Sequence, residues 1–63
     1  MSWKSCMEKK IQDHYGSGVD NCLEEMNKDN LREVAQCIVE VLGGASTAEV
    51  LANLTAWSAE CVF

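Results

Sequence analysis

The chain has 63 residues, with ten acidic and five basic side chains and a formal net charge of −5 at pH 7. This length allows one domain, residues 1–63, and leaves little material for the walls of a catalytic cleft, so we do not expect an enzyme. The acidic balance disfavours nucleic acid and anionic membrane surfaces as partners, and no apolar run reaches the roughly 18 residues of a membrane span.

The first predicted helix covers residues 2–15. Its apolar face repeats at every fourth position and consists of Trp3, Met7, Ile11 and Tyr15. Gly16 follows as a left-handed stop, and Asp20 is the expected cap of a second, short helix over residues 20–28. A helix of this length is unstable in isolation, so we expect tertiary packing to support it.

The third predicted helix covers residues 31–42. Asn30 and Glu33 have the spacing of a capping box in front of an apolar run with helical periodicity, and a glycine pair follows the run. The competing interpretation is a strand over residues 37–42, which are rich in β-branched side chains. The capping residues on both sides of the run favour the helix.

The fourth predicted helix covers residues 47–61 and follows a second capping-box pattern, formed by Ser46 and Glu49. The connections between all four segments are short, which favours antiparallel neighbours. We therefore predict an all-α fold, a compact bundle of three to four short helices in a single helical domain.

The cysteines Cys6, Cys22, Cys37 and Cys61 fall one in each predicted helix, and no pair has metal-ligand or redox-motif spacing. An even number in so short a chain favours two disulfides over reduced, buried thiols. Cys22 and Cys37 lie at similar distances from the turn between them, and Cys6 and Cys61 lie at the same pole of an up-down bundle. The Cys6–Cys22 alternative would mismatch the two heights by about 9 Å. We predict the pairs Cys6–Cys61 and Cys22–Cys37.

Residues 13–24 resemble an EF-hand calcium loop, with Asp13, Gly18 and Glu24 at its first, sixth and twelfth positions. The third and eighth positions depart from that pattern, because a tyrosine and an aspartate stand there. The alternative is a Gly-Ser-Gly turn in front of the second helix, and this is the interpretation that we adopt. We predict no metal, no cofactor and no catalytic residue, since His14 lacks a nucleophile at helical spacing.

The two halves of the chain differ in charge. Every basic residue lies at or before Arg32, while residues 33–63 contain four glutamates and no positive charge. The second half is also the more apolar one, so a lone copy would expose apolar surface there. Either a partner covers this surface or the N-terminal helix does, and we favour self-association over the latter. The predicted interface residues are Val41, Val50, Leu54 and Trp57.

These patterns predict a small, non-enzymatic protein-binding module, which would act as a secreted or periplasmic effector, inhibitor, toxin-like protein or signalling protein. One alternative is a dimeric carrier of a small apolar ligand. The outline of a four-helix chain with cysteines near both ends resembles the secretoglobins, although none of their motifs aligns. A second alternative is a cytoplasmic regulator with reduced thiols, because no apolar segment of signal-peptide type is visible in the first ten residues.

Overall fold

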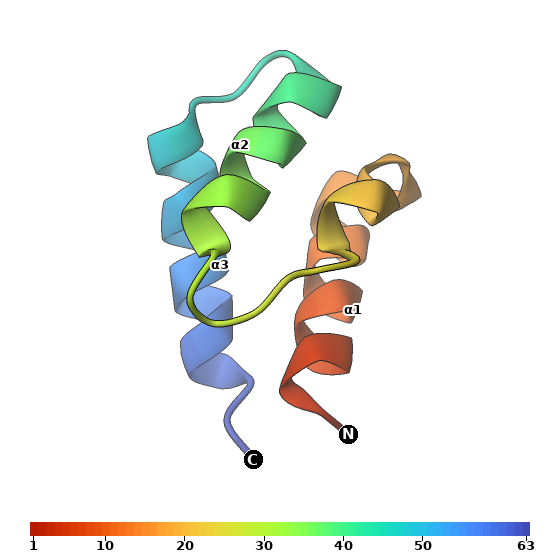
Figure 1. Ribbon diagram of the computed structural model, residues 1–63, viewed down its shortest axis with the longest axis vertical. Coiled ribbons are helices and arrows are strands. Elements are labelled where there is room, and N and C mark those ends of the chain that lie inside the picture. The colour runs from red at the N-terminus through yellow and green to blue at the C-terminus, as the bar shows by residue number, and fades with distance from the viewer.

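The computed structural model describes residues 1–63 and contains four helices and no strand, which confirms the predicted all-α fold. The elements are α1 (Trp3–Tyr15), the 3-10 helix η1 (Ser17–Leu23), α2 (Leu31–Leu42) and α3 (Thr47–Glu60). In Figure 1, α2 and α3 lie side by side and run in opposite directions, and both chain ends lie at the same end of the molecule. No helix combines the length and apolar character that a bilayer crossing requires.

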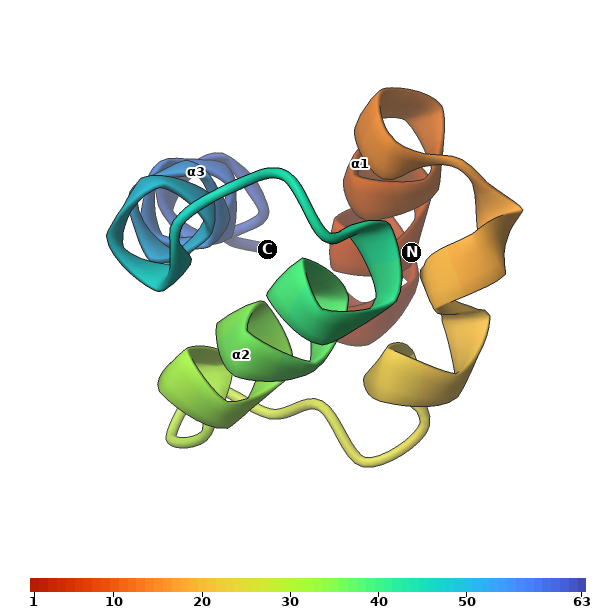
Figure 2. The same cartoon turned by 90° about the horizontal axis from the view of Figure 1, so that it is seen from above.

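The four elements surround the core as a ring. The helix α1 packs against η1 and α3, and α2 packs against the same two elements, while α1 and α2 make no close backbone contact. The view from above shows η1 between α1 and α2 on one side of the ring (Figure 2). Because each element has two neighbours, losing the contact between one pair would open the ring. The other three contacts would still join all four elements.

Side-chain hydrogen bonds mark where two of the helices begin. The hydroxyl of Ser2 accepts the backbone N–H of Ser5, and the Ser5 hydroxyl accepts the N–H of Ser2, at 3.1 Å each. At the start of α3, the Ser46 hydroxyl accepts the N–H of Glu49 at 3.1 Å, which is one of the two bonds of the predicted capping box; the return bond from the Glu49 side chain is not formed.

The predicted cap of α2 is wrong, because the Asn30 side chain makes no bond to the first turn of the helix. Its oxygen accepts the Asn27 N–H at 2.8 Å, and its amide donates to the Glu25 carbonyl at 2.9 Å. The side chain therefore closes the connection between η1 and α2. Because two backbone groups of that connection bond the Asn30 side chain, it is not available to cap α2.

The second helix differs from the prediction in type and position. It is a 3-10 helix over Ser17–Leu23, separated from α1 by Gly16 alone, whose φ of 86° suits only glycine. Asp20 lies inside this helix and does not cap it, because its carboxylate accepts the Gln12 amide at 2.9 Å. With three residues per turn, Val19 and Cys22 lie one above the other and both are buried.

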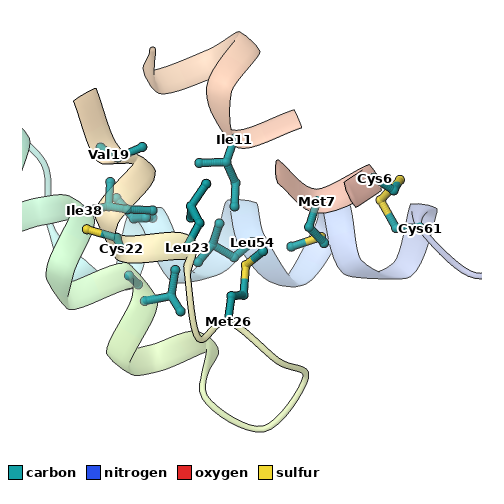
Figure 3. Close-up of a cluster of buried hydrophobic side chains, with 13 residues drawn as sticks. Cys6, Met7, Ile11, Val19, Cys22, Leu23, Met26, Ile38, Leu54 and Cys61 are labelled. Carbon is teal, nitrogen blue, oxygen red and sulfur yellow. A yellow bond between two sulfur atoms is a disulfide. The ribbon is translucent and has the colours of Figure 1, made fainter. Parts of the chain in front are cut away.

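One cluster of buried side chains forms the core, and every element contributes to it. No polar or charged side chain is buried. In Figure 3 the Cys6–Cys61 bond lies at one end of this cluster, and Val19 and Ile38 lie at the other end. The buried residues are Cys6, Met7, Ile11, Val19, Cys22, Leu23, Met26, Val34, Ala35, Ile38, Val50, Leu54 and Cys61.

The structure confirms both predicted disulfides. Cys6 and Cys61 join α1 to the end of α3, with Cα atoms 5.8 Å apart. Cys22 and Cys37 join η1 to α2, with Cα atoms 5.7 Å apart. Each bond therefore connects two neighbours of the ring, and no cysteine is left free. Helix heights predict both pairs because Cys22 and Cys37 flank one turn, while Cys6 and Cys61 lie at one end of the ring.

Candidate functional site

The predicted interface residues divide into buried and accessible ones. Val50 and Leu54 are fully buried, at 0% exposure, so they belong to the core and are not accessible at the surface, which corrects this part of the prediction. Both side chains fill the core where α3 packs against α2. Because a protein core is closely packed, side chains that fill it are not left at the surface. Val41 is 52% exposed at the end of α2. Trp57 is half-buried and packs edge-on against His14, with ring centroids 5.2 Å apart.

The outer side of α3 carries charged side chains only near its two ends, at Glu49 and Glu60. Four alanines and one threonine are exposed there at spacings of three and four residues, which place them on one side of the helix. We call this surface the alanine face. It consists of Ala48, Ala52, Thr55, Ala56 and Ala59. The sequence contained this signal in the spacing of its alanines, but our interface prediction did not use it.

The outer sides of the other two helices are charged. Lys9 and Asp13 are exposed on α1 and form a surface ion pair at 3.5 Å. Arg32, Glu33 and Glu40 are exposed on α2. A solvated helix normally carries such charges on its outer side. The alanine face of α3 is the exception in this molecule.

A seam of polar contacts holds the inner side of α3 against α1. The Trp3 indole N–H donates to the Ser58 hydroxyl at 3.0 Å, and the Asn53 amide donates to the Tyr15 hydroxyl at 2.8 Å. The Lys10 ammonium and the Glu60 carboxylate lie 3.0 Å apart. Together with the Cys6–Cys61 bond, these contacts fix how α3 is rotated, so that the alanine face points away from the core.

Large apolar side chains are also exposed at the two ends of the molecule. Val41 and Leu42, at 52% and 43% exposure, lie in the last turn of α2, which Gly43 ends with a left-handed φ of 75°. Met1, Val62 and Phe63 are exposed at the chain termini, at the opposite end of the ribbon in Figure 1. The two groups are separate and do not form one continuous surface with each other.

A cavity of about 250 Å³ opens between η1 and the first turns of α2. The Cys22–Cys37 bond contributes to its wall, and the carboxylate-bearing residues Glu24, Glu25 and Glu33 also line it. The lining offers both hydrogen-bond donors and acceptors, and it contains no basic residue. An arrangement of this kind favours a positively charged group over a neutral apolar one.

The structure also tests the EF-hand resemblance. Asp13 lies inside α1, where its carboxylate pairs with Lys9, and the stretch that follows Gly16 is the helix η1. Residues 13–24 therefore do not form the open loop that an EF-hand requires. No three potential metal ligands, those of the cavity included, are arranged so that they could hold one metal ion.

No protein-family model matches the chain, and the comparisons with curated proteins and with solved structures found no significant match. The interpretation of the alanine face and of the cavity therefore rests on their own geometry and charge.

Proposed function

We propose that this protein is a small binding module, and that the alanine face of α3 holds a helix of a protein partner. The observation that carries the proposal is a series of exposed, small and uncharged side chains along the outer side of a 14-residue helix, whose two glutamates lie near its ends. Small side chains allow two helix axes to approach closely, and removing water from an uncharged face costs little free energy. A partner helix would thus bury apolar surface that now contacts water.

The charges around the alanine face favour a partner with basic residues. Glu49 and Glu60 are the charged side chains of α3, and residues 33–63 contain no lysine or arginine. Two copies joined through this face would bring glutamates against glutamates. A partner helix flanked by lysine or arginine would instead meet them with opposite charge, which raises both association rate and specificity. We therefore favour a different protein over a second copy.

The two disulfides support an oxidising compartment, so we place this binding function outside the cytoplasm, in a secreted or periplasmic setting. A cytoplasmic regulator would keep its thiols reduced. The alternative of an apolar-ligand carrier has less support, because three glutamates line the cavity between η1 and α2.

Two synthetic helical peptides with the same alanine-rich face test the proposal, one flanked by lysines and one by glutamates. We expect the protein to raise the fluorescence anisotropy of the labelled lysine peptide only, with an affinity that falls as salt increases. Equal binding of both peptides would contradict the proposed charge preference. Binding of neither would contradict the proposed function.

A matched pair of variants locates the surface. Ala52→Arg adds a large cation to the alanine face, and Gln36→Arg adds the same side chain to the exposed side of α2. We expect Ala52→Arg to weaken binding of the lysine peptide by at least about tenfold, the effect of a hot-spot substitution. The Gln36→Arg protein should bind like the parent. Equal losses in both variants would place the binding surface elsewhere.

A further inference from the structure

The two disulfides differ in how a reagent in solution can reach them. Cys6 is 9% exposed and Cys61 is fully buried, and neither lines a cavity. Cys22 and Cys37 both line the cavity between η1 and α2, and Cys37 is half-buried. Exchange requires a thiolate to approach a sulfur atom directly, so access selects which bond reacts.

We propose that Cys22–Cys37 is a site of thiol–disulfide exchange, and that the acidic cavity beside it admits a positively charged thiol in preference to an anionic one. This proposal is independent of the alanine face, because the cavity lies on η1 and α2 and the face lies on α3. The ligand class is a thiol that carries an ammonium or guanidinium group.

The reaction balances as follows. The incoming thiolate attacks Sγ of Cys37, the more exposed partner, forming a mixed disulfide and breaking the bond to Cys22. The sulfur of Cys22 leaves with the electron pair of that bond and takes a proton from water. A second thiol attacks the mixed disulfide and releases Cys37 as a thiol. The protein disulfide is reduced, and two molecules of the small thiol are oxidised to one disulfide.

The charge preference follows from the lining of the cavity. Glu24, Glu25 and Glu33 line it, and no basic residue does. The nearby Lys4 ammonium donates to the backbone carbonyl of Glu24 and is not part of the lining. A thiolate is already negative, so a second negative group on the reagent adds repulsion, while an ammonium group offsets it.

Exchange at this site has a local structural consequence. No side-chain hydrogen bond or ion pair connects η1 to α2, so apolar packing and the disulfide alone hold these two elements together. The seam between α1 and α3 does not depend on that disulfide. Opening Cys22–Cys37 would therefore loosen η1, including the buried Val19, and leave the rest of the ring joined.

The test compares three small thiols of opposite or no charge: cysteamine, 2-mercaptoethanol and 2-mercaptoethanesulfonate, at equal thiolate concentration and low salt. The products are trapped by alkylation, cleaved with trypsin and a glutamate-specific protease, and mapped by mass spectrometry. The second protease is needed because no lysine or arginine separates Cys37 from Cys61. We expect Cys22–Cys37 to open before Cys6–Cys61 with every reagent.

We further expect cysteamine to react at Cys22–Cys37 about tenfold faster than the sulfonate, in line with the focusing of charge in a lined cavity. The difference should shrink near 1 M salt, where the Debye length is about 3 Å. Earlier opening of Cys6–Cys61 would overturn the exchange site. Equal rates for the three thiols would overturn the charge preference.

A pair of variants assigns the preference to the cavity. Glu33→Gln removes one charge from the lining, and Glu40→Gln removes the same charge from the exposed side of α2 outside the cavity. We expect Glu33→Gln to reduce the rate ratio of cysteamine to sulfonate, and Glu40→Gln to leave it at the parent value. The same ratio in both variants would show that the net charge of the protein, and not the cavity, selects the thiol.

Discussion

The two sides of the ring are closed in different ways. On one side, the seam between α1 and α3 combines a buried disulfide, two hydrogen bonds and an ion pair. On the other side, η1 meets α2 through apolar packing and a disulfide that borders a cavity. In this molecule the polar contacts are concentrated at the closure between α1 and α3, and the closure between η1 and α2 is the one that stays accessible from solution.

The chain separations of the two disulfides fit this division. Cys6–Cys61 spans 55 residues and brings both ends of the chain together, whereas Cys22–Cys37 spans 15. In the chain-entropy account, a longer closed loop removes more freedom from the unfolded chain. The seam should therefore carry the larger share of the stability.

The largest effect is expected from Cys6→Ser with Cys61→Ser. A closed loop of this length contributes about 4 kcal/mol, comparable to the whole stability of a domain this small. We expect the variant to be largely unfolded at room temperature in a circular dichroism denaturation experiment. A fully cooperative transition at the parent midpoint would show that packing alone holds the seam.

The next effect is expected from Cys22→Ser with Cys37→Ser. The shorter loop contributes about 3 kcal/mol, so this variant should be destabilised less than the seam variant. We expect early hydrogen exchange at the amides of η1 while α3 keeps its protection. Uniform loss of protection over all four helices would contradict the local role of this bond.

A smaller effect is expected from Ser58→Ala, which removes the acceptor of the Trp3 indole N–H in the seam. The loss should be about 1 kcal/mol, the usual net value of such a bond. Thr55→Ala is the matched control, because Thr55 is exposed on the alanine face of the same helix. Urea denaturation should show no loss for this control, since alanine has the higher helix propensity.

The smallest effect is expected from Lys10→Gln, which breaks the ion pair with Glu60. The Glu60 side chain is 60% exposed, so water screens the pair and its loss should cost under about 1 kcal/mol. High salt should remove the difference from the parent protein. A loss as large as that of Ser58→Ala would show that the pair organises the seam more than its exposure implies.

Much of the fold could be predicted from local signals. The bounds of α1, α2 and α3 agree with the predicted segments to within one residue at each end, because serine caps, glycine stops and apolar periodicity act over a few residues. The 3-10 geometry of η1 could not be predicted this way. It depends on how seven residues fit between α1 and α2 after a single glycine.

The candidate site was less predictable than the fold. Cys22–Cys37 was predicted, but the acidic cavity beside it arises from residues of η1, the following turn and α2 that only folding brings together. Two of the four predicted interface residues, Val50 and Leu54, are core residues. The alanine face became recognisable as an exposed surface once the opposite side of α3 was seen to be buried.

Local chemistry and the fixed rise of a helix were enough to predict the all-α class, the bounds of α1, α2 and α3, and the cysteine pairing. Which side of α3 faces the core depends on its tertiary contacts. That helix has just two charged residues, Glu49 and Glu60, so its sequence does not mark an outer side clearly. The seam with α1 fixes the rotation, since Trp3 and Tyr15 each bond a specific position on α3 and Cys6 bonds the residue that directly follows it.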